Sequence, residues 1–81
     1  MIEEVPLARL GDTVDQVVVL EWYVAAGARV EVGDRLLLVE TDKVEVEVES
    51  PFAGEVAACH VDVGDEVATG AVLCTIDTTT G

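Results

Sequence analysis

The chain contains a single lysine, Lys43, and the residues around it are those of an exposed turn. An apolar run ends shortly before the lysine, and a strict alternation of valine and glutamate follows it as far as Glu49. Alternation with a period of two places the valines on one face of a strand and the glutamates on the other. Thr41, Asp42 and Lys43 are therefore predicted to form the tip of a hairpin, with the amine held in water where another protein can reach it.

An amine in this setting is better suited to being modified than to acting as a catalyst. A lysine that works as a nucleophile by itself needs burial or a neighbouring cation to make its amine less basic. The charged residues nearest to Lys43 are the acids Glu40, Asp42 and Glu45. We therefore predict no catalytic residue in this chain, and expect a dedicated ligase to attach a group to Lys43.

Two other sets of polar residues lack the pattern of a functional site. Glu45, Glu47 and Glu49 share one face of a predicted strand, but no ligand-rich loop accompanies them to complete a calcium shell. We interpret them as a solvated strand face and predict no metal ligands. His60 lies beside Cys59 in another predicted strand, without a nucleophile pattern, and no catalytic role is assigned to it.

Length and composition indicate one small all-β domain. The chain has 81 residues, of which 51% are hydrophobic, and valine largely replaces the aromatic residues that usually fill a core. The chain is rich in valine and short of long helical patterns, which predicts the all-β class. The net charge of −13 disfavours phosphate backbones and anionic lipid as partners, so neither nucleic acid nor a membrane surface is expected.

The two cysteines, Cys59 and Cys74, lie in apolar strand patterns without a close-spaced pair, and are expected to be reduced core residues. The first residues are acidic and have no apolar core of a signal peptide. We therefore expect a soluble, monomeric domain in a reducing compartment, the cytoplasm or, for a eukaryotic source, the mitochondrial matrix.

Alternation and turn residues together divide the chain into short strands. Pro6 lacks the amide hydrogen that a central strand needs, so the first strand is predicted to lie at a sheet edge. Residues 11–16 are predicted to be a loop, residues 1–77 the domain, and residues 78–81 a tail or the start of a linker. The predicted strands cover residues 5–10, 17–24, 29–30, 36–41, 44–49, 55–61, 66–67 and 72–77.

The two halves of the chain repeat one pattern. Glycine and apolar residues recur in the first half and again 37 residues later, which implies two copies of one strand–turn–strand unit. A shorter match, between residues 30–34 and 61–65, extends no further and is interpreted as coincidence. The repeat predicts a quasi-two-fold sandwich of two small sheets, closed like a flattened barrel, with the lysine hairpin and the end of the chain at opposite poles. The matching positions are Val24, Gly27, Val30, Gly33, Leu36 and Val39 with Val61, Gly64, Val67, Gly70, Leu73 and Ile76.

Several of these segments resemble the lipoyl domains of the biotinyl/lipoyl-attachment family. The most specific segment is Glu40-Thr41-Asp42-Lys43, followed by Ser50-Pro51-x-x-Gly54 and the paired glycine turns. The resemblance runs from about residue 5 to residue 77. It implies a barrel-sandwich hybrid, a flattened β-barrel of two four-stranded antiparallel sheets.

The resemblance also implies a function. Lipoic acid would be joined by an amide bond to Lys43, and Glu40, Thr41, Asp42 and Val44 would form the recognition hairpin that a lipoate ligase or lipoyl transferase reads. The lipoyl group would act as a swinging arm that receives acyl groups from a thiamine-dependent decarboxylase and passes them to the acyltransferase core of a 2-oxo acid dehydrogenase complex. Dihydrolipoyl dehydrogenase would then reoxidise it. The domain would be a non-catalytic carrier, either part of a longer acyltransferase chain or a stand-alone protein.

The sequence departs from the family pattern at two positions beside the hairpin. Val17 stands where many members have glycine before the second strand, which affects the loop of residues 10–16 that the family places near the modified lysine. Val44 replaces the commoner alanine after the lysine.

Two alternative functions share this fold. A biotin carrier domain of a carboxylase normally has methionine on both sides of its lysine, whereas Lys43 has Asp42 and Val44. An interaction module without a cofactor usually carries a long insertion in the hairpin, and this hairpin has none. Lipoate is therefore the favoured cofactor.

Overall fold

The structure of the chain is a computed structural model that describes residues 1–8 and 15–80. In this part of the chain it contains eight short strands and one turn of 3-10 helix, in agreement with the predicted all-β class. The elements are β1 Ile2–Pro6, β2 Gln16–Trp22, β3 Arg29–Val30, β4 Arg35–Glu40, β5 Glu45–Glu49, β6 Gly54–Cys59, β7 Glu66–Ala68, β8 Val72–Asp77 and η1 Thr78–Thr80.

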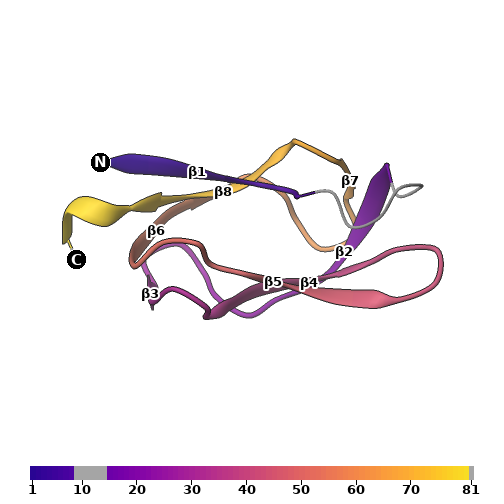
Figure 1. Cartoon of the computed structure of the whole chain (residues 1–81), viewed down its shortest axis with the longest axis horizontal. Helices are drawn as coiled ribbons and strands as arrows, with labels where there is room; N and C mark the ends of the chain where they lie inside the picture. The colour runs from indigo at the N-terminus through magenta and orange to yellow at the C-terminus, as the bar shows by residue number, and fades with distance from the viewer. Residues whose placement is uncertain (9–14, 81) are drawn as a thin grey trace.

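The strands form two four-stranded sheets packed face to face (Figure 1). One sheet has the order β1-β8-β6-β3 and the other the order β5-β4-β2-β7, and all neighbouring strands are antiparallel. With principal extents of 37 × 21 × 18 Å, the domain is elongated along one axis. The predicted flattened sandwich of two four-stranded sheets is confirmed.

The core between the sheets is built from aliphatic side chains. Branched aliphatic residues fill a thin sandwich well because their side chains are compact and stiff. Trp22 is only half-buried at the margin of the core, where its indole Nε1 donates a hydrogen bond of 2.9 Å to the carbonyl oxygen of Val61. The buried hydrophobic residues are Val5, Leu7, Val17, Val19, Val30, Leu36, Leu37, Val39, Val56, Val67, Leu73, Cys74 and Ile76.

The repeat at an offset of 37 residues is a symmetry of the backbone. Gly27 has a φ of 94° and its amide donates to the carbonyl of Val56, while Gly64 has a φ of 93° and its amide donates to the carbonyl of Val19, both at 2.7 Å. Each glycine lies in open space, so the left-handed backbone, rather than crowding, requires glycine there. Each half therefore closes a turn onto the strand that the other half supplies at the equivalent place.

The shorter match between residues 30–34 and 61–65 reflects two turns with similar local hydrogen bonds. In one turn the Asp34 carboxylate accepts a hydrogen bond of 2.9 Å from the amide of Glu31, and in the other the Asp65 carboxylate accepts one of 2.9 Å from the amide of Asp62. The two segments share the local chemistry of an aspartate-capped turn without being equivalent in the fold.

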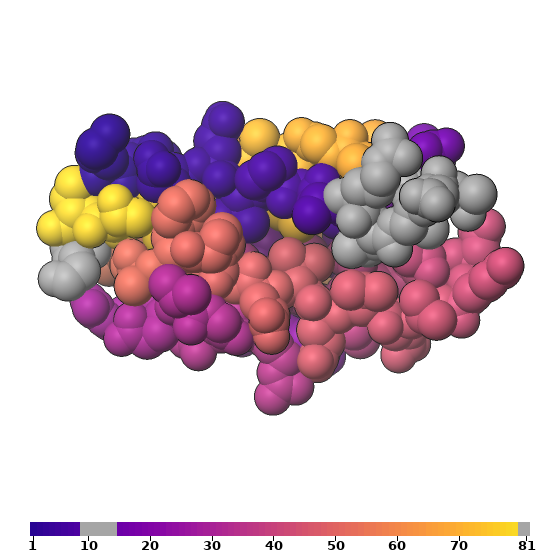
Figure 2. All heavy atoms as spheres, in the orientation of Figure 1, coloured from indigo at the N-terminus to yellow at the C-terminus, as the bar shows by residue number. Residues whose placement is uncertain are grey.

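The lysine hairpin and the chain ends lie at opposite ends of the long axis, as the repeat predicts. Figure 1 shows the β4–β5 hairpin at one end and both termini at the other. In Figure 2 the pink atoms of the hairpin form one end of the molecule, and the indigo and yellow atoms of the terminal segments gather at the other.

The predicted strand boundaries differ from the structure by one or two residues at several strands, and by more at the first strand. The first strand was expected over residues 5–10, but β1 begins at Ile2 and ends at Pro6, because it pairs with β8 from Ile2 onward and its register shifts between Val5 and Pro6. The strand predicted to reach residue 61 ends at Cys59. Most of the predicted loop, residues 11–14, lies outside the described residues, as do residues 9 and 10.

The segment predicted as a tail begins with an ordered turn. Both the amide and the hydroxyl of Thr78 donate to the carbonyl oxygen of Met1, at 2.8 and 3.1 Å. The Asp77 carboxylate in turn accepts hydrogen bonds from the amide and hydroxyl of Thr79, at 3.0 and 2.6 Å. These bonds anchor η1 to the first residue of the chain.

Candidate attachment site

A four-residue turn joins β4 to β5 and places Lys43 at its tip. Glu40 and Glu45 are the last paired residues of the two strands, and the amide of Thr41 donates to the carbonyl oxygen of Val44 at 2.8 Å. Asp42 and Lys43 are thus the two central residues of the turn. No non-glycine residue in the described ranges has a positive φ, so this turn forms without the left-handed backbone that would demand glycine or asparagine.

The hydroxyl of Thr41 holds the turn together. Its Oγ1 accepts hydrogen bonds from the amides of Lys43 and Val44, at 3.3 and 3.2 Å, and donates to the carbonyl oxygen of Val44 at 3.1 Å. A side-chain oxygen here does what a backbone carbonyl does in an ordinary tight turn. The Lys43 backbone is therefore fixed from one side while its side chain stays exposed.

The structure gathers all five predicted hairpin residues at this pole. Glu40, Asp42, Lys43 and Val44 are exposed, and Thr41 is half-buried. Val44 has 57% of its surface exposed, which a valine on the inner face of a strand would not have. Its side chain therefore adds an apolar surface next to the lysine. The roles of these residues in recognition remain predictions.

Below the turn, the hairpin is a regular ladder with a distinct inner and outer face. Val39 pairs with Val46 on the inner side, and the glutamates of β5 point outward, as the alternation predicts. Glu40 lies directly opposite Glu45, an arrangement of like charges that opposes pairing.

One ion pair stabilises the outer face of the hairpin. The guanidinium of Arg35 lies 2.9 Å from the Glu47 carboxylate and 5.8 Å from the centre of the Tyr23 ring. The Tyr23 hydroxyl donates a long hydrogen bond of 3.4 Å to the same carboxylate. Partial burial and the nearby Glu47 charge raise the pKa of Tyr23, which keeps the phenol neutral as a donor.

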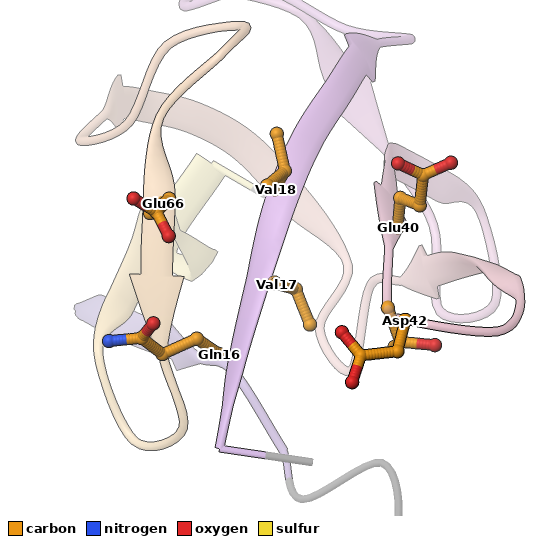
Figure 3. A pocket seen from close by; sticks show the side chains of 7 residues that line it. Gln16, Val17, Val18, Glu40, Asp42 and Glu66 are labelled. Carbon is orange, nitrogen blue, oxygen red and sulfur yellow. The ribbon is translucent and has the colours of Figure 1, made fainter.

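A hollow of about 340 Å³ lies beside the turn (Figure 3). Figure 3 shows Glu66 on one side of Val17 and Val18, with Glu40 and Asp42 on the other. Register explains the arrangement, because Val18 pairs with Glu66 of β7 and with Glu40 of β4, so that the three residues form one row across the sheet. Gln16 and Thr41 complete the lining.

Three neighbours of the Asp42-Lys43 turn were not predicted from the sequence, namely Gln16, Val18 and Glu66. Their positions depend on how β2 pairs with β4 and β7, which are far apart in sequence. Neither the alternation nor the repeat encodes that register.

The described residues give no support to a metal centre. No group of three or more His, Cys, Asp or Glu side chains within residues 1–8 and 15–80 is placed to hold an ion. Of the three strand glutamates that we considered as ligands, Glu47 is engaged by Arg35. The same part of the chain has no helix with the length and apolar character needed to cross a bilayer.

Comparison with protein families and curated proteins gives a consistent result. The Biotin_lipoyl family model, described as "Biotin-requiring enzyme", matches residues 3–76. The dihydrolipoyllysine-residue acetyltransferase component of the pyruvate dehydrogenase complex from Acholeplasma laidlawii is 36% identical over 78 residues, which cover 96% of this chain and 14% of that protein. The chain spans only about a seventh of the length of that relative.

Two solved structures share the fold. The lipoyl domain of the 2-oxoglutarate dehydrogenase complex from Azotobacter vinelandii superposes with a TM-score of 0.74 at 24% identity, covering 91% of this chain and 94% of that domain. A single-chain, multi-domain long-chain acyl-CoA carboxylase superposes with a TM-score of 0.79 at 22% identity, covering 99% of this chain and 7% of the carboxylase. At these identities the likeness concerns the fold alone.

Proposed function

This chain belongs to the biotin/lipoyl family, whose model matches residues 3–76, and we propose that it is a lipoyl carrier domain modified on Lys43. The observation that carries the proposal is the position of the only lysine at the centre of a hydrogen-bonded turn, exposed at one pole of the domain. The acyltransferase relative, matched over 96% of this chain, supports lipoate over biotin.

The residues at the turn fit a covalently attached arm. Lys43 is exposed, so its amine can enter the active site of a ligase and its modified side chain can sweep through solvent afterwards. The turn is held by the Thr41 hydroxyl, which leaves the flanking Asp42 and Val44 side chains exposed as recognition features. When attached, the lipoyl group supplies the reversible disulfide–dithiol chemistry that receives and releases acyl groups.

The domain itself contributes presentation. Thr41 fixes the backbone at Lys43, and the Arg35–Glu47 pair ties β4 to β5 so that the hairpin is presented as one unit. Glu40, Asp42 and Glu66 surround the hollow beside the turn with carboxylates. A partner that docks at this pole would need a basic surface to complement them.

The partners and compartment belong to the same proposal. A lipoate ligase or lipoyl transferase attaches the cofactor. The lipoyl arm then reacts successively with a thiamine-dependent decarboxylase, an acyltransferase core and dihydrolipoyl dehydrogenase. The relatives matched by this chain are components of pyruvate, branched-chain and 2-oxoglutarate dehydrogenase complexes, so the 2-oxo acid is left open. Cys59 and Cys74 of this chain are free thiols, which favours a reducing compartment, either the cytoplasm or, for a eukaryotic source, the mitochondrial matrix.

The test is the mass of the chain purified from its own cells, with peptide mapping across residues 36–55. We expect the mass increment of a lipoyl amide on Lys43 and none in the Lys43→Arg variant. A biotinyl increment would move the protein to the carboxylases. An unmodified chain that also stays unmodified with a lipoate ligase would leave an interaction module of the same fold and would overturn the proposal.

A further inference from the structure

The two cysteines lie directly opposite each other on neighbouring strands. Cys59 of β6 is the register partner of Cys74 of β8, although fourteen residues separate them in sequence. Directly paired residues of an antiparallel ladder project their side chains to the same face of the sheet. Cys74 is fully buried, and Cys59 is partly exposed at the edge of the same core.

The neighbouring hydrogen bonds show whether Cys59 and Cys74 form a hydrogen-bonded or a non-hydrogen-bonded pair of the ladder. The amide of His60 donates to the carbonyl of Leu73 at 2.9 Å, so the next pair along the ladder is the hydrogen-bonded one. Cys59 and Cys74 therefore occupy a non-hydrogen-bonded pair, in which the Cα atoms approach to about 4.5 Å. A disulfide needs Cα atoms roughly 4.4–6.8 Å apart and Cβ atoms roughly 3.5–4.5 Å apart, which such a pair reaches with a shift of under about 1 Å.

In the first half of the repeat, a different pair of residues occupies the positions equivalent to Cys59 and Cys74. The residues 37 positions earlier are Trp22 and Leu37, which are also register partners across their strands. One half thus fills this position with a bulky indole and a leucine, and the other fills it with two small thiols that are both free.

We propose that Cys59 and Cys74 are a cross-strand redox pair that closes to a disulfide when a small-molecule disulfide acts as the oxidant. The Cys59 sulfur attacks the oxidant, forming a mixed disulfide and releasing one thiol. The Cys74 sulfur then attacks the Cys59 sulfur, the intramolecular S–S bond forms, and the second thiol leaves. The cysteine pair loses two electrons and two protons, and the oxidant is reduced to two thiols.

The environment sets the order and the rate of these steps. Cys59 reacts first because it is the only one of the two that solvent reaches. Burial raises the pKa of the Cys59 thiol, and burial together with the neighbouring Cys59 raises the pKa of Cys74 to about 11. Both groups are therefore protonated at neutral pH, and oxidation of the folded domain is slow.

Closure would join the ends of the segment between the two strands. That segment contains β7, whose Glu66 borders the hollow beside the attachment turn. The cross-link would restrain this segment without involving Lys43, and the inference does not depend on Lys43 being modified.

The experiment measures the effective concentration of the two thiols for each other in the full 81-residue chain. The chain is equilibrated in glutathione buffers of stepped redox ratio, once under native conditions and once in denaturant, and alkylated species are counted by intact mass. We expect the native effective concentration to exceed the denatured one about 100-fold, and the oxidised chain to melt about 10 °C higher than the reduced one. Reduction with dithiothreitol reverses the shift.

The Cys59→Ser variant is the matched control, since its partly exposed position lets the variant fold. It is expected to show neither the cross-link nor the redox-dependent melting shift. A native effective concentration no higher than the denatured one would overturn the proposal. So would a product consisting of Cys59 mixed disulfides or of dimers linked through Cys59.

Discussion

At one pole of the molecule Thr41 pairs with Val44 around the Asp42-Lys43 turn, and at the other pole Thr78 pairs with Met1. The bonds are the same in both places: the threonine amide donates to the partner carbonyl at 2.8 Å, and the threonine hydroxyl donates to the same oxygen at 3.1 Å. At the first pole the two central turn residues connect the strands. At the equivalent place of the second pole lie the two ends of the chain. The repeat therefore places Lys43 at one pole and the chain ends at the equivalent position of the opposite pole.

This difference suits a carrier domain. A chain that continued from either terminus would leave from the pole opposite Lys43, about the long dimension of the domain away. Such a tether would not obstruct a partner that approaches the hairpin.

A second difference between the poles concerns two equivalent residues near the starts of β2 and β6. Gly54 begins β6, and the residue 37 positions earlier is Val17, which is buried. At Gly54 a Cβ atom would collide with the carbonyl oxygen of Asp77, so β6 approaches β8 too closely for any side chain. At the hairpin pole the side chain of Val17 is accommodated, and the hollow beside the turn lies there.

The largest effect on stability is expected from Gly54→Ala. The added methyl group meets a backbone carbonyl that cannot rotate away, so the free energy of unfolding should fall by about 3 kcal/mol. Gly27→Ala is the control, because its methyl group would meet open space and only the left-handed backbone is strained, at roughly 1–2 kcal/mol. Urea denaturation of both variants measures the difference. Equal losses at the two positions would contradict the close approach of β6 and β8.

A smaller effect is expected from Thr41→Val. The substitution keeps the shape but removes the oxygen that bonds Lys43 and Val44, which should lower the free energy of unfolding by about 1 kcal/mol and slow ligase-catalysed modification of Lys43 several-fold. Thr41→Ser restores the oxygen and should restore the rate. Thr78→Val removes the equivalent hydroxyl at the other pole, so it should lower stability without changing the rate. A slower rate in Thr78→Val would show that general loosening, rather than the turn, controls modification.

The smallest effect concerns acid stability at the pole of the chain ends. Hydrogen bonds from the Thr79 side chain and amide, with a contribution from the amino terminus 3.7 Å away, hold the pKa of Asp77 below its ordinary value of 3.8. A lowered folded-state pKa contributes stability that is complete above the unfolded pKa and is lost as the pH falls through the folded value. Asp77→Asn should therefore melt slightly lower near neutral pH, and the gap should close below about pH 4. Melting curves of both chains between pH 2 and 7 test this, and parallel curves would refute it.

The sequence predicted most of what depends on local pattern. The alternation from Val44 to Glu49 predicted the hairpin, and the recurring glycines predicted equivalent turns, because both signals arise from neighbouring residues. The prediction from local pattern failed for residues 2–4, because the two acids there belong to β1 only through their pairing with β8. Glu66 beside the turn was missed for the same physical reason, since cross-strand register is a property of the assembled sheet.

The central claim is that a ligase selects Lys43 for lipoylation by its position on the turn. The purified chain is incubated with lipoate ligase, biotin ligase and both cofactors, alongside Lys43→Arg and a variant with the turn residues exchanged, Asp42→Lys with Lys43→Asp. Intact mass should show one lipoyl group on the original chain and no modification of either variant, with all three chains folded by circular dichroism. Lipoylation of the exchanged variant at the original rate, or biotin on the original chain, would contradict the account.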